Sequence, residues 1–189
     1  MTACTQDRGV LEASMFNRIK TFEEQEKAFN PRTLQSIADI FVRNQMHHQY
    51  GAGILHRHQE LEEGCVMVHT ERNVDIDVCQ SRNLSDLDVT QLAPISLFLN
   101  EEGNFQGFEY GINGQKTELG DDFASQLRDF LFANQLQKVV AVVSKLPMVG
   151  DCCHDSIEFI HPTGNGTVRI SRQQAGAADG DTTDPVLTE

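Results

Sequence analysis

The sequence predicts an α+β protein in which about three helices pack on a mainly antiparallel sheet. Separate segments carry apolar residues at intervals of three or four positions, which is typical of amphipathic helices. Much of the remaining chain alternates apolar and polar residues, which indicates half-buried strands. Asn113-Gly114 stands between two such runs and is typical of a tight hairpin turn, which joins antiparallel strands.

The expected helices run from Val10 to Phe29, from Pro31 to about His47 and from Asp121 to Asn134. The first segment fits either one helix or two short ones, because Thr21 and Glu24 have the spacing of a capping box that starts a helix. Acidic residues in the first turn of the last helix interact favourably with its dipole. Each helix is amphipathic and is therefore expected to bury one side against the sheet.

The expected sheet has about six to eight strands. Helices from both ends of the chain are expected to pack on it. An antiparallel meander is expected for residues 52–58, 65–70 and 74–79. An antiparallel pair is expected for residues 95–99 and 105–112, which lie on either side of Glu101-Glu102-Gly103-Asn104. The polar segment 81–93 is expected to be a connection. Candidate strands occupy residues 52–58, 65–70, 74–79, 95–99, 105–112, 115–118, 139–144, 156–161 and 167–171.

Residues 1–172 are expected to form a single domain and residues 173–189 a disordered acidic tail. A chain of 189 residues is long enough to bury a core without disulfide bonds. The segment from Ala175 onward contains almost no large apolar side chains, so burial cannot offset the entropy that ordering would cost. The five cysteines have no framework spacing, so no structural disulfide is expected.

The charge of the chain argues against nucleic acids and acidic membranes as partners. Fifteen Lys and Arg stand against 28 Asp and Glu, which gives a formal net charge of −13. Such a charge repels phosphate groups, and the basic residues are scattered among the acids. The longest apolar run, Val139 to Val143, is too short to span a bilayer. We expect a location in the cytoplasm or the nucleus.

The clearest candidate site is the segment Leu55-His56-Arg57-His58. Side chains on a strand repeat every second residue, so His56 and His58 would project from one face and could bind a metal such as Fe, Mn or Zn. The expected third ligand is Glu62, with Glu60 or His69 as alternatives. The other interpretation is that His56, Arg57 and His58 face solvent, form a polar network with the following acids or bind a small molecule or partner.

Two further groups have a structural and a functional interpretation. Cys152-Cys153-His154-Asp155 contains residue types that bind zinc or form a nucleophile and base, but adjacent side chains on a strand diverge, and packing is the expectation. Asp75-Ile76-Asp77 is similar to the metal-nucleotide motif of some glycosyltransferases. It lies in an alternating strand, so its acids are expected on a solvated face opposite an apolar one.

The segment Tyr50 to Val68, with Gly51 and the Leu55-His56-Arg57-His58 core, resembles a group of uncharacterised fungal proteins. The resemblance implies an intracellular fungal protein, and some members of the group lie beside secondary-metabolite genes; it implies no activity. The spacing of the two histidines and Glu62 also resembles the first motif of the cupin family, whose members often hold a metal inside a small barrel. No histidine follows Pro162-Thr163-Gly164, where a second cupin motif would supply one.

We therefore expect a soluble accessory or binding protein without a cofactor, and the resemblance associates it with fungal secondary-metabolite biosynthesis. Its partner would be a small molecule or another protein. The alternative is an enzyme that uses the pair His56 and His58. It would be either an oxygenase or hydrolase that depends on one divalent metal, or a cofactor-free isomerase or cyclase in which the histidines act as general acid and base.

Overall fold

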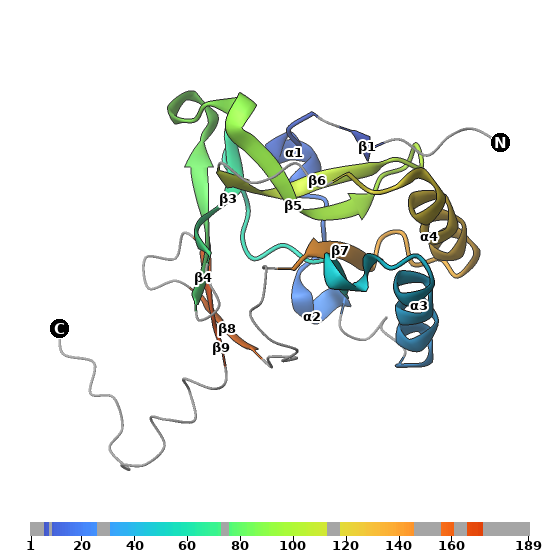
Figure 1. The fold of residues 1–189 in the computed structure, drawn as a ribbon. Coiled ribbons are helices and arrows are strands. Elements are labelled where there is room, and N and C mark those ends of the chain that lie inside the picture. Colours follow the sequence, from blue (N-terminus) through green and yellow to red (C-terminus); the bar gives the residue numbers. More distant parts are fainter. Residues whose placement is uncertain are drawn as a thin grey trace, which may run out of the picture.

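A computed structural model of the chain describes residues 6–7, 9–25, 31–72, 76–112, 118–145, 156–160 and 166–171 (Figure 1). Strands and helices alternate irregularly along it. The helices are α1 (Ala13–Phe16), α2 (Phe22–Gln25), α3 (Pro31–Arg43) and α4 (Asp121–Ala133), with short 3-10 helices η2 (Met46–His48), η3 (Leu84–Asp86) and η4 (Val89–Gln91). The strands are β1 (Gln6–Asp7), β2 (Tyr50–Ile54), β3 (Cys65–Arg72), β4 (Ile76–Asn83), β5 (Leu92–Leu99), β6 (Phe105–Ile112), β7 (Val140–Ser144), β8 (Ser156–Ile160) and β9 (Gly166–Ser171).

The described strands form one sheet in the order β2-β7-β5-β6-β3-β4-β9-β8, and β1 pairs with β6. Neighbouring strands are antiparallel except where β6 meets β3 and β1, which run parallel to it. The predicted α+β class with a mainly antiparallel sheet is therefore confirmed. The expected antiparallel pair on either side of the Glu101-Glu102-Gly103-Asn104 turn is also present, as β5 and β6.

The expected meander is wrong in its first strand. β2 pairs with β7, from Tyr50 opposite Ser144 to Ile54 opposite Val140, and only β3 and β4 pair as expected. β2 ends at Ile54, and the chain then leaves the sheet to meet the N-terminal segment, where the backbone N–H of Arg57 donates to the carbonyl of Lys20 at 2.9 Å. A hydrogen-bonding partner distant in sequence thus ends the strand earlier than its alternation predicts.

Other expectations are changed at their ends or lie outside the described residues. The segment 81–93 is not wholly a connection, because β4 continues to Asn83 and β5 begins at Leu92. Several expectations lie outside the described residues: the Asn113-Gly114 turn, residues 115–117 of the strand expected after it, the group Cys152-Cys153-His154-Asp155 and the tail 173–189.

The N-terminal helical segment is divided into two short helices, α1 and α2. The predicted capping box is seen at α2, where the backbone N–H of Thr21 donates to the carboxylate of Glu24 at 2.9 Å. The longer helices α3 and α4 have 13 residues each, close to the ranges expected from their apolar periodicity. Within the described parts of the chain, none of the helices combines the length and the apolar character that crossing a membrane requires.

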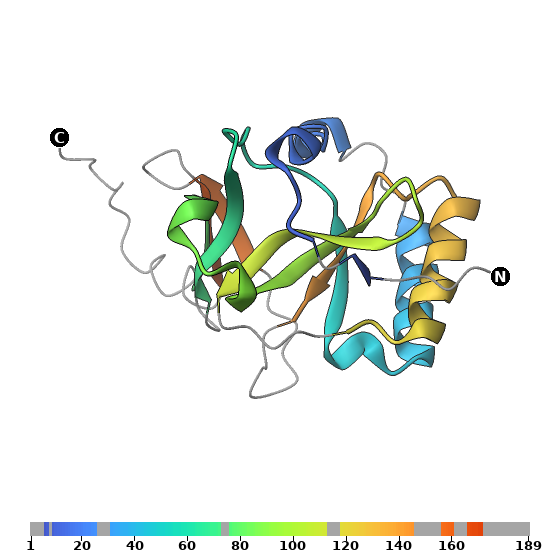
Figure 2. The same cartoon turned by 90° about the horizontal axis from the view of Figure 1, so that it is seen from above.

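The two long helices lie side by side and cover one face of the sheet (Figures 1 and 2). Phe41 of α3 and Phe123 of α4 meet edge to face, with ring centroids 4.9 Å apart. The core beneath them also includes residues of β2, β5, β6 and β7. Its largest fully buried members include Ile37, Tyr50, Leu97, Phe105, Leu127, Leu131 and Val140.

The N-terminal segment 9–25 packs on the opposite face. Successive residues of a strand point to opposite faces, and in β7 Val142 belongs to the core under α3 and α4 whereas Ala141 belongs to a second core. Figure 2 shows α1 (dark blue) well away from the pair α3 and α4. The second core contains Leu11, Ala13, Phe16, Ile19, Leu55, Leu61, Met67, Cys79 and Phe108. The central strands are therefore covered on both faces.

Gly107 in β6 lies tightly against β5. A Cβ atom added there would be 2.7 Å from Cβ of Pro94 and 3.1 Å from Cε1 of Tyr110. The proline ring cannot turn aside, so we expect Gly107→Ala to lower the free energy of unfolding by about 1–3 kcal/mol, measured by urea denaturation. Gly53→Ala in β2 is the control, because its added Cβ would be at an ordinary 3.5 Å from Val143. Equal losses in the two variants would contradict the expected clash.

Candidate functional site

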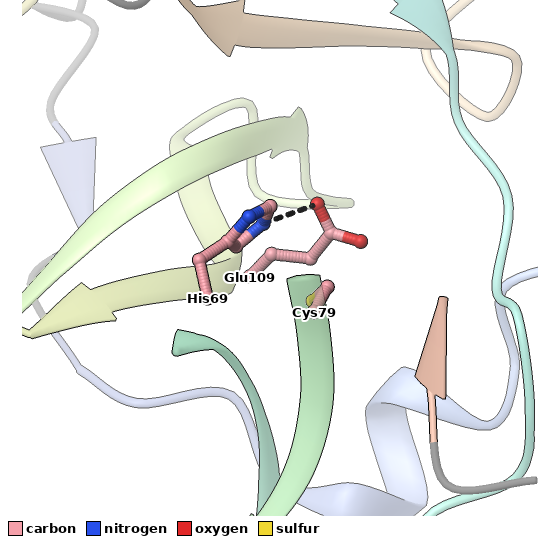
Figure 3. A group of neighbouring side chains, drawn as sticks. All are labelled: His69, Cys79 and Glu109. Atoms are coloured by element: carbon pink, nitrogen blue, oxygen red, sulfur yellow. Dashed lines mark hydrogen bonds and ion pairs between the residues drawn. The ribbon is translucent and has the colours of Figure 1, made fainter. Parts of the chain in front are cut away.

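A cluster of polar side chains is buried on the sheet face that the N-terminal segment covers. The pairing of four strands brings its members together. Cys79 of β4 lies opposite His69 of β3, and Ser96 of β5 lies opposite Glu109 of β6. β3 and β6 are parallel neighbours, so His69 and Glu109 come to adjacent strands. Figure 3 shows the side chains of His69, Cys79 and Glu109 turned toward one another.

His69 lies between two carboxylates. Its Nδ1–H donates to the carboxylate of Asp77, and its Nε2 lies 3.5 Å from Oε2 of Glu109. Asp77 precedes Cys79 by two residues on β4 and so shares its face of the strand. A β-bulge after His69 shifts the β3–β4 register at this point. Such bulges redirect side chains, and this one lies directly beside the cluster.

Glu109 is the centre of the cluster. The hydroxyl of Ser96 donates to its Oε2 at 2.6 Å, and Nε2 of His58 lies 3.4 Å from its Oε1. Its side chain is only 10% exposed, so an uncompensated charge would be costly there. The contacts with Ser96, His58 and His69 compensate for the lost hydration.

The two histidines decide the protonation state of Glu109. Burial alone would raise the pKa of this carboxyl, but the hydrogen bonds from His58 and His69 and their positive charges outweigh burial and hold the pKa well below its usual value. Burial would likewise lower the pKa of His69, yet its bonds to Asp77, Cys79 and Glu109 raise that pKa well above its usual value. The cluster without any bound ion is therefore an imidazolium held between two carboxylates.

Cys79 is not a reactive thiol in this state. Its side chain is 3% exposed, and burial together with the negative charge of Glu109 raises the pKa of the thiol to about 12. The nucleophile in cysteine chemistry is the thiolate, which requires a lowered pKa and access. Cys79 and Cys65 are both free of disulfide bonds. The arrangement of Asp77, His69 and Cys79 thus does not support nucleophilic catalysis.

The three side chains in Figure 3 are also the types that bind transition metals. One ligand atom each from His69, Cys79 and Glu109 can be chosen so that all lie within 4.8 Å of one another. Among the described residues this is the group of His, Cys and acidic side chains that converges in this way. Imidazole nitrogen, thiolate sulfur and carboxylate oxygen are the donors found in zinc sites.

The predicted histidine pair is close together, although not on a strand. The rings of His56 and His58 meet edge to face with centroids 4.6 Å apart, in the segment that follows β2. The Nδ1–H of His56 donates to the carbonyl of Ile54 at 2.8 Å, and its ring packs on Phe22. His58 reaches Glu109 instead, so the two rings have different surroundings.

Arg57 joins this segment to the N-terminal residues. Its Nε–H donates to the carbonyl of Ile19 at 2.8 Å, and its guanidinium lies 3.3 Å from the carboxylate of Glu60. These contacts give Arg57 a structural role. A binding role for His56, Arg57 and His58 together stays a prediction.

The predicted metal set of His56, His58 and Glu62 differs from the group that the fold assembles. The side chain of Glu62 is exposed, and the converging ligand atoms in the described part of the chain belong to His69, Cys79 and Glu109. Of these, His69 is an alternative ligand in the sequence analysis, whereas Cys79 and Glu109 were missed. The signal for Glu109 was its place in β6, where it is the only charged residue of a strand rich in buried positions.

The expected solvated face of the Asp75-Ile76-Asp77 run is wrong for Asp77, because its side chain is 11% exposed and bonds to His69. Asp75 lies outside the described residues. The face that carries Asp77 continues to the buried Cys79, so a polar and an apolar residue share one covered face. Alternation alone could not identify which face of this strand is buried, because the outcome depends on what packs against it.

Comparisons with known proteins add no assignment. A scan against family models, a search of curated proteins and a search of solved structures each found no match to this chain. The resemblances to fungal proteins and to the first cupin motif therefore stay predictions, and the functional argument depends on the cluster itself.

Proposed function

We propose that the protein binds one divalent transition-metal ion, zinc being the best fit, through His69, Cys79 and Glu109. The observation that carries the proposal is the convergence of the three ligand atoms within 4.8 Å from three adjacent strands. Ligand atoms on one tetrahedral zinc lie about 3.3–3.8 Å apart. His69 Nε2 and Glu109 Oε2 are already 3.5 Å apart, whereas the group as a whole, within 4.8 Å, would contract by up to about 1 Å to hold an ion.

The donor set supports zinc over the other metals. A thiolate favours zinc, iron or copper over magnesium and calcium, and a mixture of sulfur, imidazole and carboxylate ligands suits the tetrahedral geometry of zinc. The ligand charges also match. The Cys79 thiolate and the Glu109 carboxylate together neutralise a divalent ion, so the bound metal and its ligands would bury no net charge.

Residues around the ligands support the same proposal. Histidine ligands usually donate their second ring N–H to a carboxylate, and ligating carboxylates are themselves hydrogen-bonded. The Nδ1–H of His69 donates to Asp77, which leaves Nε2 directed toward Glu109. The hydroxyl of Ser96 donates to Glu109. Both ligands are therefore oriented by a second residue.

Metal binding would change the protonation of the cluster. The pKa of Cys79 is high because of burial and the charge of Glu109, and a coordinated cation opposes both effects. Coordination of a thiol to zinc deprotonates it outright, and the ring nitrogen of His69 must likewise lose its proton to bind. The raised pKa values thus describe the metal-free state and predict that protons are released on binding.

The burial of the ligands supports a structural role for the ion. Structural zinc sites are closed to solvent, whereas catalytic ones keep an open position for water or substrate. The side chains of His69 and Glu109 are 7% and 10% exposed, and Cys79 is also buried. An ion at this point would link β3, β4 and β6, which agrees with the expected accessory or binding protein more than with the alternative oxygenase or hydrolase.

Titration of chelator-treated protein with cobalt(II) tests the proposal. We expect one ion per chain, a thiolate-to-cobalt charge-transfer band, and displacement of the cobalt by one equivalent of zinc. Cys79→Ser is expected to lose the band and to weaken zinc binding by at least about 100-fold. Removal of a ligand lowers metal affinity more than removal of a residue that only hydrogen-bonds to a ligand. Cys65→Ser, a free cysteine on β3, is the matched control and should bind like the wild type.

Two results would overturn the proposal. One is a wild-type protein that binds neither cobalt nor zinc at micromolar concentrations. The other is a Cys79→Ser variant that binds zinc as tightly as Cys65→Ser. The first result would leave the cluster as a network of buried ion pairs without a metal, and the second would show that Cys79 is not a ligand.

A further inference from the structure

The metal site proposed above has three ligands from the sheet, and a closed tetrahedral zinc site requires four. We propose that His58 supplies the fourth ligand, so that the segment 55–61 closes the site and controls the exchange of the metal. This inference rests on the proposed function, because without a metal there is no fourth position to fill.

The position of His58 is the first argument. It is the residue of the cluster that does not come from a sheet strand, since β2 ends at Ile54. Its Nε2 lies 3.4 Å from Oε1 of Glu109, whereas Nε2 of His69 approaches Oε2, so the two imidazoles flank the carboxylate and a common ion would use both oxygens or a turn of the carboxylate. Its side chain is only 11% exposed. His58 therefore reaches the carboxylate from a segment outside the sheet.

The surroundings of His58 are the second argument. The ring of His56 contacts it edge to face, and the Nδ1–H of His56 is committed to the carbonyl of Ile54. His56 thus packs against His58 and is not assigned as a ligand. Ser96 also contacts Glu109. Its hydroxyl donates a hydrogen bond to the carboxylate and so orients it. A neutral imidazole is the donor that completes the site without adding charge.

The attachment of the segment 55–61 is the third argument. Asn17 and Leu61 are joined by two hydrogen bonds, from the side-chain amide to the carbonyl at 2.9 Å and from the backbone N–H to the side-chain oxygen at 2.8 Å. Arg57 bonds to the carbonyls of Ile19 and Lys20. Residues 17–21 and 55–61 therefore form one cover over this face of the sheet. For an ion to leave, His58 must dissociate and this cover must open.

The test compares His58→Ala with the control His56→Ala by two measurements on cobalt-loaded protein. In His58→Ala we expect the thiolate band to remain, the ligand-field bands to weaken as water replaces the imidazole, and the rate of metal transfer to an excess of chelator to rise about 10- to 100-fold. Added imidazole should restore the spectrum and slow the transfer. His56→Ala should keep the spectrum of the wild type. Arg57→Ala, which loosens the cover without removing a ligand, should speed the transfer at an unchanged spectrum.

X-ray absorption of the wild-type zinc protein gives a readout that does not depend on the folding of a variant. Scattering from two imidazoles and one sulfur supports the inference, whereas scattering from one imidazole overturns it. A His58→Ala spectrum and transfer rate equal to those of the wild type would also overturn it. Both of these results leave the three-ligand site intact, whereas a wild-type protein that binds no cobalt rejects the proposed function itself.

Discussion

Glu109→Ala is expected to lower the free energy of unfolding of the metal-free protein by about 3–5 kcal/mol. The variant removes the carboxylate that accepts from Ser96 and lies between His58 and His69, and all three partners remain in place. His69 keeps its bond to Asp77, but removal of one partner from a buried polar network leaves the remaining partners uncompensated, which is more costly than the loss of the network as a whole. Urea denaturation in the presence of a chelator measures this effect apart from any bound metal.

Glu109→Gln separates the charge from the hydrogen bonds. Its amide oxygen can still accept from Ser96, so a smaller loss of about 1–3 kcal/mol is expected. The control is Glu101→Ala, because Glu101 forms an exposed ion pair with Lys138, and such pairs contribute at most about 1 kcal/mol. A Glu109→Ala loss no greater than that of Glu101→Ala would contradict the view that the cluster is a compensated buried network.

Leu127→Ala should be among the most damaging changes in the other core, with an expected loss of about 2–5 kcal/mol. Leu127 is 0% exposed and lies on α4 within the core shared with α3. The substitution removes buried methyl groups and leaves a cavity that the close packing of the two helices cannot fill. Urea denaturation followed by circular dichroism measures the loss.

The matched control is the same substitution on the neighbouring helix. Leu34 of α3 is 38% exposed, so Leu34→Ala should change the free energy of unfolding by less than about 1 kcal/mol. Equal losses at the two positions would mean that α4 does not pack as described. Since Leu127 lies on the sheet face opposite the polar cluster, its variant should retain the cobalt spectrum of the wild type.

The helices and most strands could be predicted because their signals are local. The apolar periodicity predicted α3 and α4, and the spacing of Thr21 and Glu24 predicted the start of α2. The alternation of residues likewise located β6 over its whole length. Such signals are carried by residues within a few positions of one another, and no distant partner is needed to interpret them.

The candidate site could not be predicted in the same way. His69 and Cys79 are near in sequence and the hairpin of β3 and β4 brings them together, but Glu109 reaches them only because β6 lies parallel beside β3. Two histidines two residues apart were the more visible signal. They lie beyond the end of β2, and only His58 turns toward the cluster.

The sequence by itself determined the α+β class, the places of the main helices and strands and the excess of negative charge. These follow from composition and from periods of two and of about 3.6 residues. Only the tertiary structure decided that β2 pairs with β7, that the N-terminal segment covers the second face of the sheet, and that His69, Cys79 and Glu109 meet. The physical reason is that strand order and burial depend on how segments distant in sequence pack together. The same packing determines which side chains lie next to a buried charge.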